Sequence, residues 1–148
     1  MSQITDFLSP TAENLIAQYG TPLLRFCYLY LLDLEQAQKV VQAVFVRAYA
    51  YFSAHEFDEK KLLRITVRLC RKHASPYAQG TAAAEAPILF AFQHMTTLER
   101  EIILLHYYTE LALEDVASIS CLPVFVIKHC LSSGEHLLER CSPDALTD

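Results

Sequence analysis

The last fifty residues carry the pattern that most restricts how this chain folds. Thr96 and Glu99 have the spacing of a helical capping box. Apolar-periodic segments follow at residues 96–108, 113–119 and 123–140, with a tight turn at residues 120–122. This order predicts a helix-turn-helix preceded by a capped helix. The residues expected to point inward are Leu98, Ile102, Leu105, Tyr108, Ile127, Leu131, Gly134 and Leu138.

The positive charge that usually accompanies a DNA-binding helix-turn-helix is missing here. Lys128 and Arg140 are the only basic residues of the last predicted helix, and Glu135 and Glu139 offset them. Residues 74–148 hold three Lys and Arg against ten Asp and Glu, a net charge of −7. Residues 1–73 hold nine against seven, a net charge of +2. The basic residues are therefore concentrated in the half without the helix-turn-helix.

Length and composition favour an all-α protein of one large domain or two small ones. The chain has 148 residues, 53% of them hydrophobic, and only three Gly, which argues against a turn-rich β fold. No apolar run approaches the roughly 18 residues of a membrane span. Residues 1–10 lack the basic and apolar segments of a signal peptide. We therefore expect a cytoplasmic protein without a membrane span.

Four helices are predicted in the first half. Ser9-Pro10 is typical of a helix start, and the helix that it opens is expected to end at Gly20. Thr21-Pro22 repeats the start signal and opens a second helix, apolar nearly all round, to about residue 32. Asp33 then caps a third helix. The apolar stripe of that helix consists of Ala37, Val41, Val44, Phe45, Ala48 and Phe52.

The fourth predicted helix has an apolar face and a basic face. Its apolar face is formed by Leu62, Ile65 and Leu69. Its basic face, which we call the basic ladder, consists of Lys60, Lys61, Arg64, Arg68, Arg71 and Lys72. Cations at helical spacing can follow a nucleic-acid backbone by neutralising successive phosphates. The alternative is a solvated helix surface, which Lys and Arg often line without binding anything.

A segment rich in small residues separates the two halves. Residues 75–87 read SPYAQGTAAAEAP, a composition typical of a linker. We therefore predict a helical domain at residues 1–74, a linker at 75–90 and a second helical domain at 91–148. Acidic residues of the second domain that folded against the basic ladder would mask it.

The sequence has no pattern typical of an enzyme or a cofactor site. The six histidines are dispersed, and there is no phosphate-binding glycine loop or nucleophile motif. The five cysteines include no CxxC pair. A zinc site would have to draw on Cys121, His129, Cys130 and Cys141, whose spacing is unlike that of zinc knuckles. Free, partly buried thiols are the favoured interpretation, and we predict no catalytic residue, no metal and no cofactor.

Both halves resemble one protein family. The segment LIAQYGTPLLRFCYLYLLDLEQAQKVVQAVFVRAYAYF, followed by LLRITVRLCRKH, is similar to the second conserved region of bacterial extracytoplasmic-function sigma factors of the sigma-70 family. The segment beginning TLEREIILLHYY is similar to their fourth region. The match covers residues 12–73 and 92–140, in the family's order and with a linker between them. It implies two helical domains that dock on RNA polymerase and read a promoter.

The resemblance assigns polymerase docking to the third predicted helix. Family members typically carry a run such as D-A-E-D-L-V-Q-E there, whereas residues 36–43 read QAQKVVQA, without the acids. The basic ladder corresponds to the segment that melts DNA and reads the minus-ten element. Lys61 stands where the family places a tryptophan, which leaves Phe57 and Tyr77 as nearby aromatic residues. The implied docking residues are Gln38, Lys39, Gln42 and Phe45.

The last predicted helix matches the family's promoter-reading helix in its buried positions and in Lys128. The implied DNA-reading residues are Val124, Phe125, Lys128, His129 and Ser132. Arginines that family members use nearby are replaced by Cys130, Ser133 and Glu135. Cys121 stands in place of the turn glycine, where a positive φ would strain it. Val124, Phe125 and Val126 form an outward apolar cluster, a feature that more often meets protein than DNA.

Two functions from different classes are open at this point. The first is a sigma factor that directs promoter-specific transcription initiation. Its partners would be core RNA polymerase, promoter DNA and an anti-sigma factor or another regulatory protein. The second is a sigma-derived protein-interaction module that no longer reads promoter DNA. The two-domain pattern favours the first function, and the substitutions in both binding helices favour the second.

Overall fold

The computed structural model describes residues 12–74 and 87–141, and every regular element within these ranges is a helix. The predicted all-α fold is confirmed, and the helix start predicted at Ser9-Pro10 lies outside the described residues. No single described helix is long and apolar enough to cross a membrane. The segments Leu113–Ser120 and Val124–Arg140 reach the necessary length and apolar composition only when taken together, and they meet at a bend of 104°. The elements are α2 (Ala12–Leu31), α3 (Leu34–Phe52), α4 (Glu59–His73), α5 (Pro87–Gln93), α6 (Thr97–Ile103), η2 (Leu104–Tyr108), α7 (Leu113–Ser120) and α8 (Val124–Cys141).

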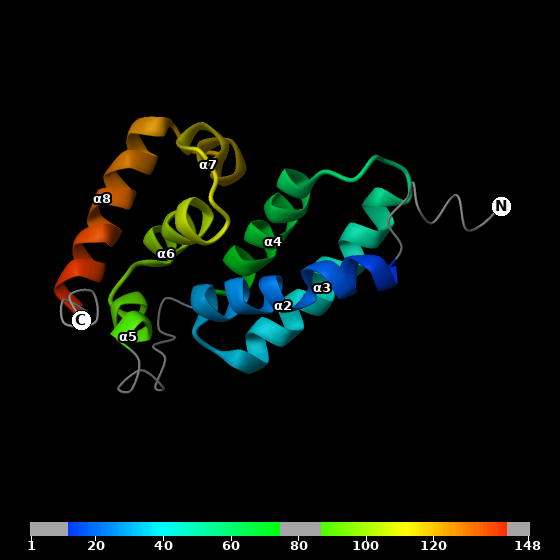
Figure 1. Cartoon of the computed structure of the whole chain (residues 1–148), viewed down its shortest axis with the longest axis horizontal. Coiled ribbons are helices and arrows are strands. Elements are labelled where there is room, and N and C mark those ends of the chain that lie inside the picture. Colours follow the sequence, from blue (N-terminus) through cyan, green and yellow to red (C-terminus); the bar gives the residue numbers. More distant parts are fainter. Residues whose placement is uncertain (1–11, 75–86, 142–148) are drawn as a thin grey trace.

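The helices form two groups that pack side by side (Figure 1). The first group consists of α2, α3 and α4, and the second of α5 to α8 with the π-helical turn η2. α2 packs on α3 and α4, while α6 and η2 contact α2, and α7 contacts α4. Buried residues of both groups form one hydrophobic cluster, from Leu15 in α2 to Leu131 in α8. α5 was not predicted. It includes the last residues of the segment assigned to the linker, and it packs on α8.

The two helices predicted for residues 10–32 are one continuous helix, so the predicted break at Gly20 is wrong. Pro22 lies inside α2 and is exposed to solvent. A proline in a helix interior costs about 3 kcal/mol, because it removes a backbone hydrogen bond and crowds the preceding turn. Leu23, Phe26 and Leu31 of the same helix are almost completely buried, and each such side chain contributes about 1.5–3 kcal/mol. Burial along one helix therefore outweighs the proline.

α3 begins at the predicted cap. Asp33 Oδ1 accepts a hydrogen bond from the backbone N–H of Gln36 at 3.1 Å. The apolar stripe is slightly rotated from the predicted one, because Val40 is fully buried whereas Val41 and Phe45 are only half-buried. The remaining predicted members of the stripe are buried: Ala37, Val44, Ala48 and Phe52.

α4 is buried on more sides than its predicted apolar face, because it lies between α2 and α3 on one side and α7 on the other. Asp58 caps it by accepting a hydrogen bond from the Lys60 N–H at 3.1 Å. Cys70 Sγ lies 3.6 Å from Cys27 Sγ of α2, and both are buried free thiols. The surface of α4 is largely the basic ladder. Its buried residues are Leu62, Ile65 and Leu69, as predicted, together with Leu63, Thr66, Val67 and Cys70.

The second group contains the predicted capping box and helix-turn-helix. Thr96 Oγ1 accepts a hydrogen bond from the Glu99 N–H at 3.1 Å, and Glu99 Oε1 accepts one from the Thr96 N–H at 2.9 Å. Cys121, in the turn between α7 and α8, has φ 59° and ψ 44°. Gly134 lets α8 approach α6 closely, since a Cβ at this position would lie 2.6 Å from Ile103 Cγ1.

Candidate nucleic-acid interface

The six side chains of the basic ladder form two adjacent stripes along α4. A helix turns by about 100° per residue, so residues 60, 64 and 71 fall within about 40° of one another. Residues 61, 68 and 72 fall within a neighbouring sector of about the same width. We call Lys60, Arg64 and Arg71 the inner stripe, because their side chains hydrogen-bond to residues of α6 and α7. The outer stripe consists of Lys61, Arg68 and Lys72.

Arg71 of the inner stripe binds a fully buried carboxylate on α6. Its Nε and Nη2 donate to Oε1 and Oε2 of Glu101 at 2.8 and 2.6 Å, and Nη2 also donates to the Ser120 carbonyl at 2.7 Å. The Glu101 side chain has no exposed surface, whereas that of Arg71 is 40% exposed. The hydrogen bond to Glu101 raises the pKa of Arg71. This is the geometry of a two-pronged, charge-assisted pair.

The same carboxylate receives a third donor from the first group of helices. The Tyr30 hydroxyl of α2 donates to Glu101 Oε1 at 2.7 Å, and both residues are buried. Burial, and after it the charge of Glu101, raises the pKa of Tyr30, so the hydroxyl keeps the proton that it donates. Glu101 therefore joins α6 to both α2 and α4. Three donated bonds offset the cost of removing its charge from water.

The other two cations of the inner stripe contact α7. Lys60 Nζ lies 2.9 Å from Asp115 Oδ1, and the hydrogen bond to Asp115 raises the pKa of Lys60. Arg64 Nη2 donates to Ser118 Oγ at 3.1 Å. Asp115 and Ser118 are three residues apart, so they share one side of α7. The second half thus contacts the ladder along the inner stripe, an arrangement that the sequence left open.

The outer stripe faces solvent beside an aromatic ring. Arg68 and Lys72 are exposed and form no hydrogen bond or ion pair with another residue of the described ranges. Lys61 Nζ lies 4.6 Å from the centroid of the Tyr51 ring of α3, a cation–π contact. The Tyr51 ring in turn stacks on His55, with centroids 4.0 Å apart. A row of cations is thus bordered by an aromatic surface.

Tyr51 was missed in the sequence, where Phe57 and Tyr77 were the candidate aromatic residues. Phe57 packs inward, with ring centroids 5.0 Å from Phe52 and 5.5 Å from Tyr19. Tyr77 lies outside the described residues. Tyr51 precedes α4 on a different helix, so only the packing of α3 on α4 brings it to Lys61.

Two further residues that organise the interface were also missed. Glu101 and Arg100 are consecutive residues of α6, whose sequence is TLEREII, and both are buried. Arg100 is buried and donates to the carbonyls of Phe92 and Tyr30, at 2.7 and 3.0 Å, and its burial lowers its pKa. A buried charged residue needs polar partners, but the three consecutive charges of this segment do not show which of them is buried. The identity of those partners depends on the tertiary fold.

The residues assigned to DNA reading lie mostly on the surface of α8. Phe125 is 74% exposed, and Lys128, His129 and Ser132 are also exposed. Val124 and Val126 are half-buried, so the outward apolar cluster predicted there is reduced to Phe125. The first half of α8 therefore presents one cation, Lys128, beside a large apolar side chain.

Two residues that replace family arginines on α8 bond to the neighbouring helices. Ser133 donates to a carboxylate oxygen of Glu99, and the Tyr107 hydroxyl donates to Glu135. The hydrogen bond to Glu135 is also the main reason why the pKa of Tyr107 is raised. The third replacement, Cys130, is a half-buried thiol. These positions hold α8 on α6 and η2.

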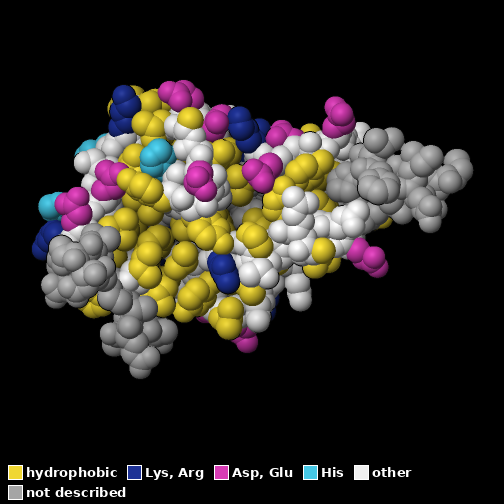
Figure 2. Space-filling view, in the orientation of Figure 1, with side chains coloured by type: hydrophobic (Ala, Val, Ile, Leu, Met, Phe, Trp, Pro, Cys, Tyr) yellow, Lys and Arg dark blue, Asp and Glu magenta, His cyan; other side chains and the backbone are white. Residues whose placement is uncertain are grey.

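Apolar side chains extend over the open surface of the second group. Figure 2 shows hydrophobic side chains filling much of the face over α5, α6 and the adjoining part of α2, with acidic side chains over α7 and α8. Ile88 and Phe90 of α5 are 52% and 42% exposed. This face of the second group is thus acidic and apolar.

The residues assigned to polymerase docking lie beside a groove between α2 and α3. Gln38, Lys39 and Gln42 are exposed and Phe45 is half-buried. The groove has a volume of about 680 Å³ and is almost entirely apolar. Its lining residues are Ile16, Gly20, Val41, Gln42, Phe45, Val46 and Tyr49. Of the implied docking residues, Gln42 and Phe45 therefore line this apolar groove, whereas Gln38 and Lys39 do not.

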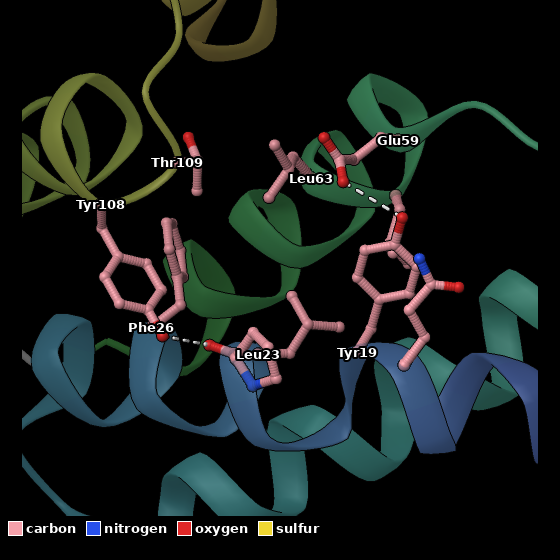
Figure 3. Close-up of a pocket in the computed structure, with 10 residues that line it drawn as sticks. Tyr19, Leu23, Phe26, Glu59, Leu63, Tyr108 and Thr109 are labelled. Atoms are coloured by element: carbon pink, nitrogen blue, oxygen red, sulfur yellow. Dashed lines mark hydrogen bonds between the residues drawn. The ribbon is translucent and has the colours of Figure 1, made fainter.

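A second cavity, of about 440 Å³, lies at the seam between the two groups (Figure 3). At one end the Tyr108 hydroxyl donates to the Pro22 carbonyl at 3.3 Å, and at the other Tyr19 donates to Glu59 Oε2 at 3.1 Å. Burial is the main cause that raises the pKa of Tyr19 to about 12. None of the predicted site residues lines this cavity.

The alternative zinc site finds no support in the described ranges. Within them, no group of three or more His, Cys, Asp or Glu side chains could hold a metal ion. Cys121 and His129 are exposed and Cys130 is half-buried. The Cys141 side chain is not among those described.

Comparison with known proteins gives matches in structure but not in sequence. No protein-family model and no curated protein matches the chain. CnrH, solved in complex with the cytosolic domain of CnrY, matches with a TM-score of 0.67 and 20% identity, over 87% of this chain and 85% of the matched one. The sigma factor RpoE, solved in complex with the anti-sigma factor NepR from Bartonella quintana, matches with a TM-score of 0.66 and 18% identity, over 85% and 92%. This chain therefore has the fold of an extracytoplasmic-function sigma factor, as its sequence resemblance implied.

Proposed function

We propose that this protein is a sigma factor that acts in the cytoplasm, binding core RNA polymerase and contacting promoter DNA. The observation that carries the proposal is the outer stripe, in which Lys61, Arg68 and Lys72 lie beside Tyr51 on a helix whose apolar face is buried. Cations in a row bind a phosphate backbone with release of counterions, and the exposed His55 ring, stacked on Tyr51, offers an aromatic face to an unpaired base. This surface favours contact with a melted strand over base reading in a duplex.

In this proposal core polymerase docks on the exposed side of α3, at Gln38, Lys39, Gln42 and Phe45. Without the acids of the family, docking relies on apolar contact in the groove between α2 and α3. Residues 1–74 act as the first domain and residues 91–148 as the second. α8 adds a weak contact with the upstream element, at Val124, Phe125, Lys128, His129 and Ser132.

A protein regulator is part of the same proposal. Two structural neighbours were solved with protein partners, RpoE with the anti-sigma factor NepR and CnrH with the cytosolic domain of CnrY. In this chain the exposed Phe125 and the apolar surface of α5 offer contact area of the kind that protein partners cover.

A second candidate is a protein-interaction module that no longer reads promoter DNA. The observation in its favour is the bonding on α8. Ser133 and Glu135, at positions of family arginines, bond to Glu99 and Tyr107 and hold α8 on its own neighbours. A glutamate there also repels phosphate.

Reconstitution with core polymerase tests the proposal. We expect the chain to bind core polymerase and to give run-off transcripts that depend on the promoter. Arg68→Ala with Lys72→Ala should abolish the transcripts without preventing polymerase binding. Arg140→Ala, at an exposed residue near the end of α8, is the control for loss of a positive charge. Polymerase binding without a transcript from any promoter would favour the interaction module, and failure to bind polymerase would contradict the proposal.

A further inference from the structure

The groups that bond to the inner stripe are chemically similar to those of a nucleic-acid backbone. Arg71 binds two carboxylate oxygens and a carbonyl, Lys60 a carboxylate oxygen and Arg64 a hydroxyl. Phosphates offer anionic oxygens to the same guanidinium and ammonium donors. A donor held by α6 or α7 is not free for phosphate. The second half and a nucleic acid therefore compete for the inner stripe.

The two stripes are close enough for one strand to use both. They occupy neighbouring sectors of a single helix, about 80° apart between centres. Arg68 and Lys72 of the outer stripe are open to solvent, whereas the cations of the inner stripe are partly or largely exposed and are hydrogen-bonded to α6 and α7. A strand that follows the outer stripe therefore meets α7 at its edge. To use the cations of the inner stripe, the strand has to compete with their hydrogen bonds to α6 and α7 while the two groups are docked in this way.

The docked arrangement leaves two buried polar atoms without hydrogen bonds where α4 meets α7. Arg64 Nε and Ser120 Oγ are buried without a hydrogen-bond partner in the described part of the chain. Buried donors and hydroxyls without partners are a cost to the state that contains them. The Lys60–Asp115 pair is largely exposed, with side chains 53% and 34% accessible, so it contributes little. The buried Glu101 is the strong contact, and the α7 contacts are weak.

We propose that α6 and α7 act as an internal mimic of a phosphate backbone, which keeps the inner stripe closed until nucleic acid displaces it. Glu101 is the positioning residue that holds the closed state, and Asp115 and Ser118 form its edge. The inference rests on the proposed DNA contact of the ladder. It adds that the free protein binds DNA with half of the ladder only.

Variants of the full chain test the mimic through the affinity for a labelled single-stranded DNA oligomer, measured by fluorescence anisotropy at fixed salt. Asp115→Asn with Ser118→Ala removes the exposed edge and should tighten binding about threefold. Glu101→Gln keeps the shape of the side chain, removes its charge and should tighten binding about tenfold. Glu114→Gln is the matched control. It is exposed, adjacent to Asp115 and makes the same change in net charge, and it should leave the affinity unchanged.

The design separates failure of the mimic from failure of the proposed function. Arg68→Ala removes an outer-stripe cation and should weaken DNA binding. If it does so while the Asp115/Ser118 and Glu101 variants bind like the parent chain, the mimic is refuted and the DNA contact stands. If Arg68→Ala has no effect, the proposed DNA contact itself is refuted. Circular dichroism checks each fold, and the Asp115/Ser118 variant decides the matter if Glu101→Gln unfolds.

A cross-linking experiment measures the competition directly. A carbodiimide activates the Asp115 carboxylate, and the Lys60 amine, 2.9 Å away, displaces the activating group to form an amide. Mass spectrometry quantifies the joined peptides. Saturating DNA should lower the yield of this cross-link. An unchanged yield would overturn the mimic, since the two groups would then remain docked in the DNA complex.

Discussion

Arg71 of α4 and Glu101 of α6 form a two-pronged ion pair across the seam between the two groups of helices, with N–O distances of 2.8 and 2.6 Å. The carboxylate is fully buried, and the guanidinium is reached by water from one side. A buried pair adds little to stability beyond what apolar residues of the same size would give, but a buried charge without its partner is strongly unfavourable. The pair therefore specifies which faces of the groups meet, because another docking would leave Glu101 without donors.

Loss of the Glu101 carboxylate should destabilise the whole fold. In Glu101→Ala the Tyr30 hydroxyl loses its acceptor in a buried position, and Arg71 loses both of its carboxylate contacts. We expect the free energy of unfolding to fall by about 3 kcal/mol, as measured by urea denaturation. Glu114→Ala, at an exposed acid of α7, should change it by less than about 0.5 kcal/mol. Equal effects of the two variants would contradict this account.

The two described glycines should respond in opposite ways to alanine. At Gly134 a Cβ would lie 2.6 and 2.9 Å from Ile103 Cγ1 and Cδ1 in a buried contact, and overpacking of this kind costs about 1–3 kcal/mol. At Gly20 the nearest atom, Ile16 Cγ2, would be at an ordinary 3.7 Å. Gly20→Ala should therefore raise the free energy of unfolding by up to about 1 kcal/mol through helix propensity. Thermal unfolding of both variants measures the contrast, which a stabilising Gly134→Ala would refute.

The turn of the helix-turn-helix should be improved by glycine. Cys121 has φ 59° and ψ 44°, a left-handed conformation that costs a residue with a side chain about 1–2 kcal/mol. Glycine removes this strain but loses more chain entropy on folding. Cys121→Gly should still stabilise the protein, by about 0.5–1 kcal/mol in urea denaturation. Ala50→Gly, in the exposed interior of α3, is the control and should destabilise by about 1 kcal/mol.

Alkaline pH should reduce stability through Tyr19. Its pKa is raised to about 12 from 10.0, first by burial and then by Glu59. As pH rises above 10 the unfolded chain loses this proton while the folded chain keeps it, so the free energy of unfolding falls until pH passes about 12. Tyr19→Phe should flatten that fall, measured by urea denaturation at several pH values in this window. Tyr49→Phe, at an exposed tyrosine, should leave the slope as it is.

The parts of the fold that could be predicted depend on neighbours in the sequence. The caps at Asp33 and at Thr96 with Glu99 act over three residues, and they start α3 and α6 where predicted. At Gly20 and Pro22 the local signals are misleading, because the long-range burial of α2 opposes them. Short-range chemistry is visible in a sequence, whereas its competition with packing becomes visible only in the folded chain.

The candidate site shows the same division. The spacing of the basic ladder was visible in the sequence, since it lies within one helix. The bonding of its inner stripe depends on residues far along the chain: Glu101 is 30 residues from Arg71, and Asp115 is 55 from Lys60. The aromatic ring beside Lys61 also comes from another helix, at Tyr51. A role that depends on the packing of one helix on another cannot be predicted from the periodicity of either helix.

The hydrophobic cluster shared by the two groups gives the second half a structural role that is independent of DNA binding: it helps to form the common core. Ile102, Leu105 and Val116 belong to the same cluster as Leu23 and Leu62. Truncating any of them would open a cavity in a core that also supports α2 and α4. Surface positions of α8 such as Ser132 carry no such constraint. Mutation can thus remove a DNA-reading surface while the helices beneath it are kept, because those helices also bury part of the core of the neighbouring half.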